Sequence, residues 1–360
     1  MNGRADIVLF GTGSFAARIL FDLAATVRDA LAIAVVGRDA ARLAWLRTGA
    51  NARAAMFSTG IRVAEHRLES FSTEAVAELI ARLGPKVVAN TASEQGGRQV
   101  TDRPDGWTLL VREAGLGMTA ALQAKISVDI ARAVAASPGV RFVNCCYPDV
   151  VNPMLAAAGL PITSGIGNVA ILAHAFAGVL GPGHPRIRML AQHAALAAFR
   201  GPAEERQGQA PLRLWLGEEE ATDVFTRFAA VKLAPEPVVD ISGASGVPLF
   251  VALATGREWA GHAPGPNGLP GGYPVRFDGA ELRLDLPPGL GAAAAVAWNA
   301  AFEERNGVVV GADRRVRYTG RVESVFRQIS PEVAAGFSMA DFEAAYRAVA
   351  DLRTRQRARP

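Results

Sequence analysis

The sequence predicts an α/β protein, with an N-terminal doubly wound parallel sheet followed by a C-terminal α+β domain. Apolar runs typical of strands alternate with amphipathic helical stretches as far as Cys145. Beyond residue 155 the pattern changes to longer helices and pairs of short strands. A chain of 360 residues is long for one core, so we expect domains at 1–155 and 156–352 and a disordered basic tail at 353–360.

The first domain is expected to alternate strictly between strand and helix. Its strands are apolar throughout, as strands buried on both faces of a parallel sheet are. They are expected at Asp6–Phe10, Ala32–Gly37, Arg62–His66, Lys86–Asn90 and Val140–Cys145. Amphipathic spacing predicts helices at Ser14–Leu23, Ala40–Thr48, Thr73–Leu83 and Thr119–Ala136.

The second domain mixes helices and strands without a repeat. Helices are expected at Asn168–Leu180, Ala221–Phe228, Val238–Thr255, Ala292–Arg305 and Met339–Arg353. Strands are expected at Ile187–Gln192, Arg213–Leu216, Val275–Phe277, Glu281–Leu284, Val308–Val310 and Val316–Tyr318. A proline- and glycine-rich stretch, 263–273, precedes the third of these strands.

The first strand passes directly into a glycine turn, Gly11–Ala16, that opens a helix. Gly11 permits the turn, Gly13 would let a diphosphate approach the backbone, and Ala16 lets the helix pack closely on the strand. The helix N-terminus adds unpaired N–H groups and the positive end of the helix dipole. This context favours a dinucleotide site over a structural glycine turn, with contacts from Gly11, Thr12, Gly13, Ser14 and Phe15.

The end of the second strand indicates which dinucleotide binds. NAD sites usually carry an acidic residue there, which binds the ribose hydroxyls. Here Arg38 takes that place and Arg42 follows one helical turn later. A guanidinium can pair with a 2′-phosphate, so we expect NADP, with NAD as the other possibility. In the alternative interpretation, Asp39 caps the next helix and Arg38 is a solvated surface residue.

Composition narrows the kinds of partner and the cellular compartment that we expect for this protein. The formal charge is +4, but 35 of the 38 basic residues are arginines without a basic stripe, so nucleic acid is not an expected partner. The two cysteines, Cys145 and Cys146, are adjacent and form no disulfide framework, which is typical of a reducing compartment. No apolar run is long enough to span a bilayer. We therefore expect a cytoplasmic protein with a small-molecule substrate and no membrane partner.

Several short motifs together resemble the lactate/malate dehydrogenase-like superfamily, which has an N-terminal Rossmann domain and a C-terminal α+β domain. The matching segments are Val87–Ala92 at the fourth strand, Gly117–Thr119 after the mobile loop, Asn144–Asn152, Pro161–Phe176, His193 after its strand, and Gly271–Tyr273. The resemblance implies nucleotide contacts at Asn90, Thr91 and Ala92, and a homodimer or homotetramer. It also implies His193 as the catalytic acid or base. From their places in the chain, Asn144 is a candidate to hold the carboxamide or the substrate oxygen, and Asn168 is a candidate to supply a neutral hydrogen bond in place of the missing charges.

The departures from the family exclude an ordinary 2-oxo acid dehydrogenase. Ile171 stands where the family has the aspartate that orients its histidine, and His174 replaces the arginine that binds the substrate carboxylate. Ala120 is nearest to the missing mobile-loop arginine. Arg98, Arg103 and Arg112 are candidate replacements for that loop cation. His174, Lys125, Ser242 and Ser245 are the candidate substrate contacts.

The sequence therefore predicts an NAD(P)H-dependent oxidoreductase that transfers a hydride between nicotinamide and a C=O or C=N carbon. Its substrate is expected to be something other than a simple 2-oxo acid, and no metal site is expected. Two alternatives stay open. One is an NAD- and metal-dependent glycosidase-like enzyme, although Gly165–Asn168 lacks the cysteine ligand of that branch. The other is a nucleotide-binding sensor without catalysis.

Overall fold

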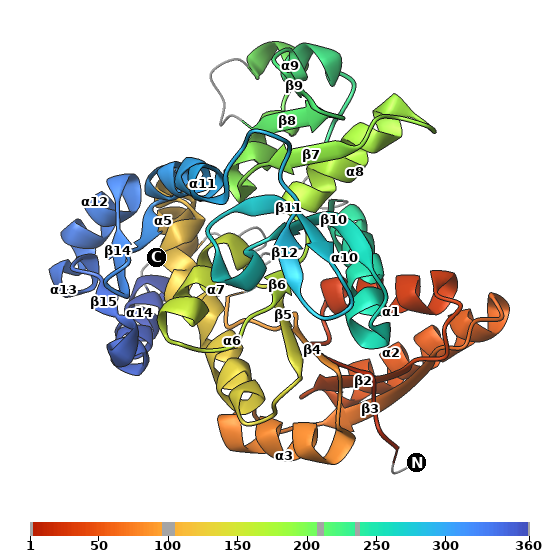
Figure 1. Ribbon diagram of the computed structural model, residues 1–360. Coiled ribbons are helices and arrows are strands. Elements are labelled where there is room, and N and C mark those ends of the chain that lie inside the picture. Colours follow the sequence, from red (N-terminus) through yellow and green to blue (C-terminus); the bar gives the residue numbers. More distant parts are fainter. Residues whose placement is uncertain (1–2, 96–104, 207–211, 235–237, 359–360) are drawn as a thin grey trace.

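A computed structural model describes residues 3–95, 105–206, 212–234 and 238–358. Its centre is a six-stranded parallel sheet in the order β3-β2-β1-β4-β5-β6 (Figure 1). The strands are β1 (Ile7–Phe10), β2 (Ala32–Gly37), β3 (Arg62–Arg67), β4 (Val87–Asn90), β5 (Arg141–Asn144) and β6 (Ser164–Gly165). The expected doubly wound sheet is confirmed, and it takes in β6, which lies beyond residue 155.

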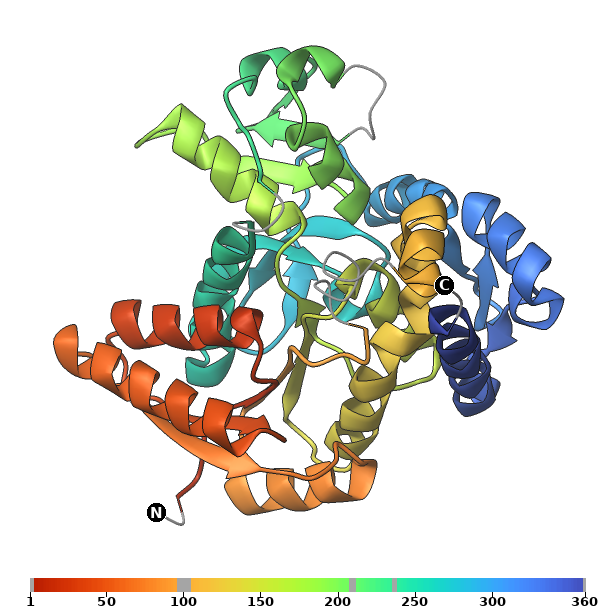
Figure 2. The same cartoon turned by 180° about the vertical axis from the view of Figure 1, so that it is seen from behind.

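Alternate residues of β1 and β2 face two separate cores. Ile7 and Leu9 pack with α1 (Ser14–Thr26), α2 (Ala40–Met56) and α10 (Val238–Thr255). Val8 and Phe10 pack on the other face, beneath α3 (Thr73–Leu83), α6 (Ala120–Ala135) and α7 (Pro148–Ala157). Figure 2 shows α10 alongside α1, so a helix of the second half covers the first domain. Burial on both faces explains why these strands carry no polar alternation.

The second half places α8 (Val169–Leu180) and two small antiparallel sheets beyond β6. One sheet contains β7 (Ile187–Leu190), β8 (Arg213–Leu216) and β9 (Glu219–Ala221), which α9 (Val224–Arg227) follows. The other contains β10 (Trp259–Pro264), β11 (Gly272–Phe277) and β12 (Leu282–Leu284). The sequence analysis missed β10, because its glycine and proline obscure the strand pattern.

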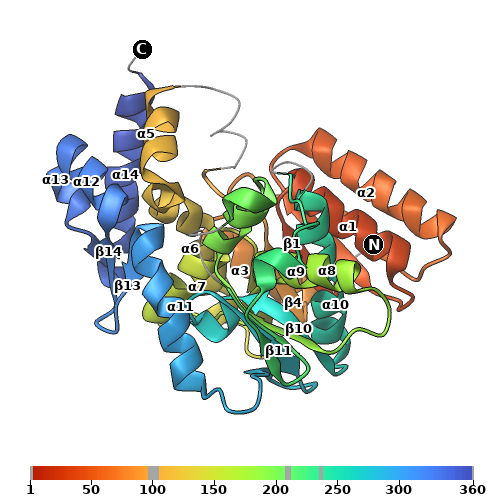
Figure 3. The ribbon, with the colours of Figure 1, turned by 90° about the horizontal axis from the view of Figure 1, so that it is seen from above.

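The C-terminal part returns to the first domain. It contains α11 (Ala292–Asn306), β13 (Val308–Val310), β14 (Arg315–Tyr318), α12 (Gly320–Ile329), α13 (Pro331–Ala334), β15 (Phe337–Ser338) and α14 (Phe342–Arg357). Figure 3 shows α12 and α14 grouped with α5 (Gly106–Ala114). Phe326 and Phe342 share a core with Trp107 and Met118, so the two halves have no separate cores here.

The expected disorder of the tail is wrong as far as Arg357, because α14 continues through it. Arg353 Nη1 donates a hydrogen bond to the Glu94 carbonyl (2.8 Å). The Arg357 Nε atom lies 3.3 Å from Asp105 Oδ2. These basic side chains thus bind the segments that flank α5, and this attachment orders the helix end. No helix in the described part of the chain combines the length and apolarity needed to cross a bilayer.

Candidate active site

The glycine turn leaves its main chain open towards solvent. Gly11 has φ +118°, and a Cβ atom there would lie 2.2 Å from the Thr91 hydroxyl oxygen. That hydroxyl donates to the Phe10 carbonyl (2.7 Å), which ties the ends of β1 and β4 together. A Cβ at Gly13 would meet nothing within 4 Å, and no side chain caps α1. The turn therefore offers free amides and an open approach, which is what a diphosphate needs.

Two arginines flank this turn at the end of β2. The Asp39 carboxylate accepts a hydrogen bond from the Arg42 amide (3.0 Å) and so caps α2, as the alternative interpretation predicts. Arg42 Nε donates to the Thr12 carbonyl (2.7 Å). The Arg38 guanidinium lies over the Phe71 ring, 5.9 Å from its centroid. Because the acid is engaged as a cap, the surface beside the turn is dominated by guanidinium groups.

A cavity of about 340 Å³ opens where α1 meets the second half of the chain, at the carboxyl ends of the central strands. The residues that line it come from seven segments of the chain, from α1 to α10. They are Phe15, Leu116, Gln123, Cys145, Tyr147, Pro148, Ile166, Asn168, Ile171, His193, Leu196, Arg200 and Ser242. The cavity thus brings together His193, Asn168, Phe15 and Ser242 from the set of residues predicted from the sequence.

His193 is held at this cavity by a chain of hydrogen bonds. Its Nδ1 atom lies 3.1 Å from Asn168 Oδ1, and the Asn168 amide group donates to Asp149 Oδ2. The His193 main-chain N–H donates to the same carboxylate oxygen (3.2 Å). Since an amide oxygen only accepts, His193 carries its proton on Nδ1 and leaves Nε2 free as an acceptor. Asp149 therefore orients the imidazole through Asn168.

The backbone at Asn168 supports this arrangement at a conformational cost. Asn168 has φ +47° and ψ −106°, a conformation that is rare for a residue with a side chain. Such strain persists only where surrounding contacts fix it, and it often marks a functional site. Here Asp149 and His193 hold the two ends of the side-chain amide. The strained residue is therefore the one that links the acid to the imidazole.

Burial sets the protonation states of this group. Burial, and then the positive charge of Arg200, lower the pKa of His193 to about 4. Burial raises the pKa of Asp149 to about 7, although the hydrogen bonds from His193 and Asn168 oppose the shift. Burial, and then the Asp149 charge, raise the pKa of Glu303 to about 8. At neutral pH the half-buried imidazole is therefore neutral.

The structure contradicts the catalytic role predicted for Asn144. Its side chain is fully buried and accepts hydrogen bonds from the Ser127 hydroxyl (2.9 Å) and the Cys146 amide (3.0 Å). It also donates to Asn152 Oδ1 (2.9 Å). Asn90 is similarly buried and fixes the turn after β4 through the Ala92 main chain. Both side chains hold strand ends in place and leave no group free for a ligand.

Three predicted substrate contacts lie outside this cavity. Lys125 binds Asp129 (2.9 Å) and Glu343 (3.0 Å), which joins α6 to α14. His174 lines a different cavity, because the outer face of α8 turns it away from His193. The Ser245 hydroxyl donates to the Ser242 carbonyl (2.8 Å) within α10. Arg112 lies on α5, whereas Arg98 and Arg103 fall outside the described residues.

The sequence analysis missed two charged residues of the site. Asp149 follows the proline that begins α7, where an acid is usual for helix-dipole reasons and carries little signal. Arg200 lies seven residues after His193, at the end of a short 3-10 helix. Only the fold brings both beside His193. Among the described residues, no three His, Cys, Asp or Glu side chains group as a metal site.

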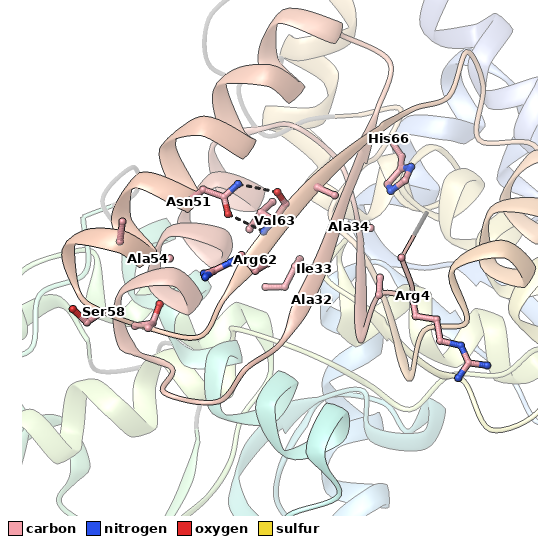
Figure 4. A pocket seen from close by; sticks show the side chains of 15 residues that line it. Arg4, Ala32, Ile33, Ala34, Asn51, Ala54, Ser58, Arg62, Val63 and His66 are labelled. Atoms are coloured by element: carbon pink, nitrogen blue, oxygen red, sulfur yellow. Dashed lines mark hydrogen bonds between the residues drawn. The ribbon is translucent and has the colours of Figure 1, made fainter. Parts of the chain in front are cut away.

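A larger cavity, of about 590 Å³, lies elsewhere, beside β2 and β3 (Figure 4). Arg4, Arg62 and His66 line it, and none of the predicted site residues does. The Asn51 side chain donates to the Val63 carbonyl (2.8 Å) and accepts from the Val63 amide (3.0 Å), as the dashed lines in Figure 4 show. Asn51 therefore occupies the free edge of β3.

Comparison with known proteins identifies the fold. No protein-family model and no curated protein matches the sequence. The malate dehydrogenase of Cryptosporidium parvum is 12% identical over 83% of this chain and 96% of that chain, with a TM-score of 0.50. The lactate dehydrogenase of Eimeria maxima, solved with NADH and oxamate, is 13% identical over 82% of this chain and 91% of that chain, with a TM-score of 0.48. The protein therefore has the fold of the malate dehydrogenase.

Proposed function

We propose that the protein is an NADP-dependent oxidoreductase in which His193 exchanges a proton with the substrate oxygen or nitrogen. The observation that carries this proposal is the chain from Asp149 through Asn168 to His193, which ends at a cavity beginning at Phe15. Phe15 belongs to the helix that the glycine turn opens. A nucleotide on that turn would direct its reactive end into the same cavity.

The residues around the turn fit a dinucleotide phosphate. The amides of the Gly11–Phe15 segment would hold the diphosphate, and Arg38 with Arg42 would hold the 2′-phosphate. Cys145 and Ser242 line the same cavity as His193. When bound, the nicotinamide supplies or takes up the hydride.

The side chains of this protein supply the proton transfer. In its resting form His193 carries a proton on Nδ1 and accepts at Nε2, so it begins as a base for an alcohol or amine substrate. Once Nε2 is protonated, the Asp149 carboxylate stabilises the imidazolium through Asn168. In the reverse direction the same imidazolium returns its proton to the carbonyl or imine.

Among the described residues that line the cavity, Arg200 is the one cation, and we propose that it faces the substrate. Its charge lowers the pKa of His193. Replacing Arg200 with glutamine is therefore expected to raise that pKa, whereas lysine should leave it low. An NMR titration of the imidazole signals measures this shift in the free protein. An unchanged His193 pKa in Arg200→Gln would contradict the proposed coupling.

The preference for NADP is tested by replacing Arg38 with aspartate. Loss of a charge-assisted phosphate contact should weaken NADPH binding about 10- to 100-fold, while NADH binding stays similar. Calorimetric titration of both nucleotides measures the change. Arg355→Asp, on the exposed end of α14 across the molecule, is the matched control (Figure 1). Equal NADPH affinity in the wild type and Arg38→Asp would remove the case for Arg38.

A further inference from the structure

A second cavity of about 290 Å³ lies between α8, the start of β7, and β10. Three of the five histidines of the chain line it: His174 on α8, His184 before β7, and His262 on β10. Arg186 and Asp285 complete its polar lining. Figure 1 shows α8, β7 and β10 next to one another. The proposed function makes no use of these side chains.

Two of the imidazoles expose the same nitrogen to the cavity side. His174 Nδ1 lies 2.7 Å from the Ala170 carbonyl, and His184 Nδ1 lies 2.8 Å from the Pro185 carbonyl. A carbonyl oxygen only accepts, so each ring holds a proton on Nδ1 and leaves Nε2 without a partner in this contact. Protonation of either ring would then convert Nε2 into a charged donor.

His262 is the buried member of the group. Its residue is 8% exposed, and its Nε2 atom has no hydrogen-bond partner among the described residues. Pairing of β10 with β11, which sets His262 opposite Pro274, fixes its position. A buried polar atom without a partner is costly, so it points to a ligand that would satisfy it.

The charges beside the cavity favour an anion over a cation. Arg186 pairs with Asp285. Arg188 lies next to the same carboxylate, with its Nε 3.7 Å from Asp285 Oδ2, and that Nε lacks a hydrogen-bond partner. Two guanidinium groups thus face one carboxylate. The positive charges of Arg186 and Arg188 also help burial to lower the pKa of His262, so a bound anion would relieve a real repulsion.

We propose that this histidine cavity, defined by His174, His184, Arg186 and His262, binds a small oxyanion such as a phosphate or carboxylate group. Arg186 supplies permanent charge, and the unpartnered Nε2 of His262 supplies a buried hydrogen-bonding group in the same cavity. Asp285 opposes binding and is held neutralised by Arg186.

Calorimetric titration of the full chain with inorganic phosphate, and separately with acetate, tests the site and distinguishes the two oxyanion classes. We expect at least one of them to bind with measurable heat at one site per chain. NMR should show shifted imidazole signals for His174, His184 and His262. Absence of binding by both anions would overturn the proposal.

Substitutions of the cavity histidines test where the anion binds. His174→Ala and His184→Ala change exposed or half-buried residues, so they should fold, and together they should weaken binding about tenfold. His262→Gln tests the buried nitrogen with an amide of similar shape. His66→Ala is the matched control on β3, and phosphate affinity should not change in it. Anion binding that shifts only the His193 signal, or tight Zn²⁺ binding at the three histidines without anion binding, would contradict the site.

This proposal stands independently of the nucleotide site. Arg38→Asp should leave phosphate binding at the histidine cavity intact, whereas the paired His174→Ala and His184→Ala changes should leave NADPH affinity unchanged. The two sets of variants therefore separate failure of one proposal from failure of the other.

Discussion

His193→Gln is expected to lower the turnover number by about 10²- to 10⁴-fold, the usual contribution of a positioned acid or base. Glutamine can still pair with Asn168 but cannot carry a proton at the cavity. The proposed nucleotide site lies on the glycine turn, away from His193, so NADPH affinity should remain. Nicotinamide absorbance measures turnover, with a substrate found by screening aldehydes, ketones and imines, and calorimetry measures binding.

The control for this change is His66→Gln, which alters a half-buried histidine on β3 away from the cavity. It should retain full turnover. If His193→Gln also retained full turnover, proton transfer would have to be assigned to another group. If the wild type bound NADPH but reduced no carbonyl or imine compound, a nucleotide sensor without catalysis would be favoured.

Asp149→Asn is expected to reduce turnover about 10²-fold, because it removes the charge that stabilises the His193 imidazolium while keeping its shape. The new amide oxygen can still accept from Asn168 and from the His193 main chain. Orientation is thus preserved and only the electrostatic contribution is lost. His193 titrates near pH 4, where Asp149 is already protonated, so an NMR titration should show the same His193 pKa in the variant and in the wild type. A changed His193 pKa would show that the substitution also disturbs the geometry of the site.

The same variant should alter how stability depends on pH. The folded state raises the pKa of Asp149 to about 7, well above its unfolded value. Between these values the folded protein keeps a proton that the unfolded chain releases, so stability falls as the pH rises from about 4 to 7. Asp149→Asn should reduce this slope, and Glu303, with its pKa of about 8, should account for part of the remainder. Urea unfolding at several pH values measures both.

The sequence predicts the central sheet well because local and global signals agree there. Runs such as Ile33–Val36 are apolar throughout, and the structure buries them on both faces. The signal fails where proline interrupts a pattern. α7 contains Pro153 within the helix, and β10 ends at Pro264. The first stretch therefore lacks the composition typical of a helix, and the second lacks that of a strand. The ordered tail depends on Glu94 and Asp105, which are distant in sequence.

The candidate site is predictable only in part for a similar reason. His193 and Asn168 follow from motif positions, and the structure joins them. Asp149 acts from a different segment, in place of an aspartate on α8 where Ile171 now stands. Motif reasoning assigned Asn144 to chemistry because strand ends gather at the site, but its hydrogen bonds are all internal. Contacts between residues far apart in the chain decide such roles, and a single sequence does not show which residues make these contacts.

The two hydrogen bonds between the Asn51 side chain and the Val63 main chain affect how copies of this protein can associate. The edge strand of a sheet normally exposes main-chain N–H and C=O groups, with which a strand of another molecule can pair. Fibrils grow in this way. Here one amide side chain already takes both main-chain groups of Val63, the second residue of β3. Molecules crowded together should therefore resist strand-by-strand growth at this position of β3.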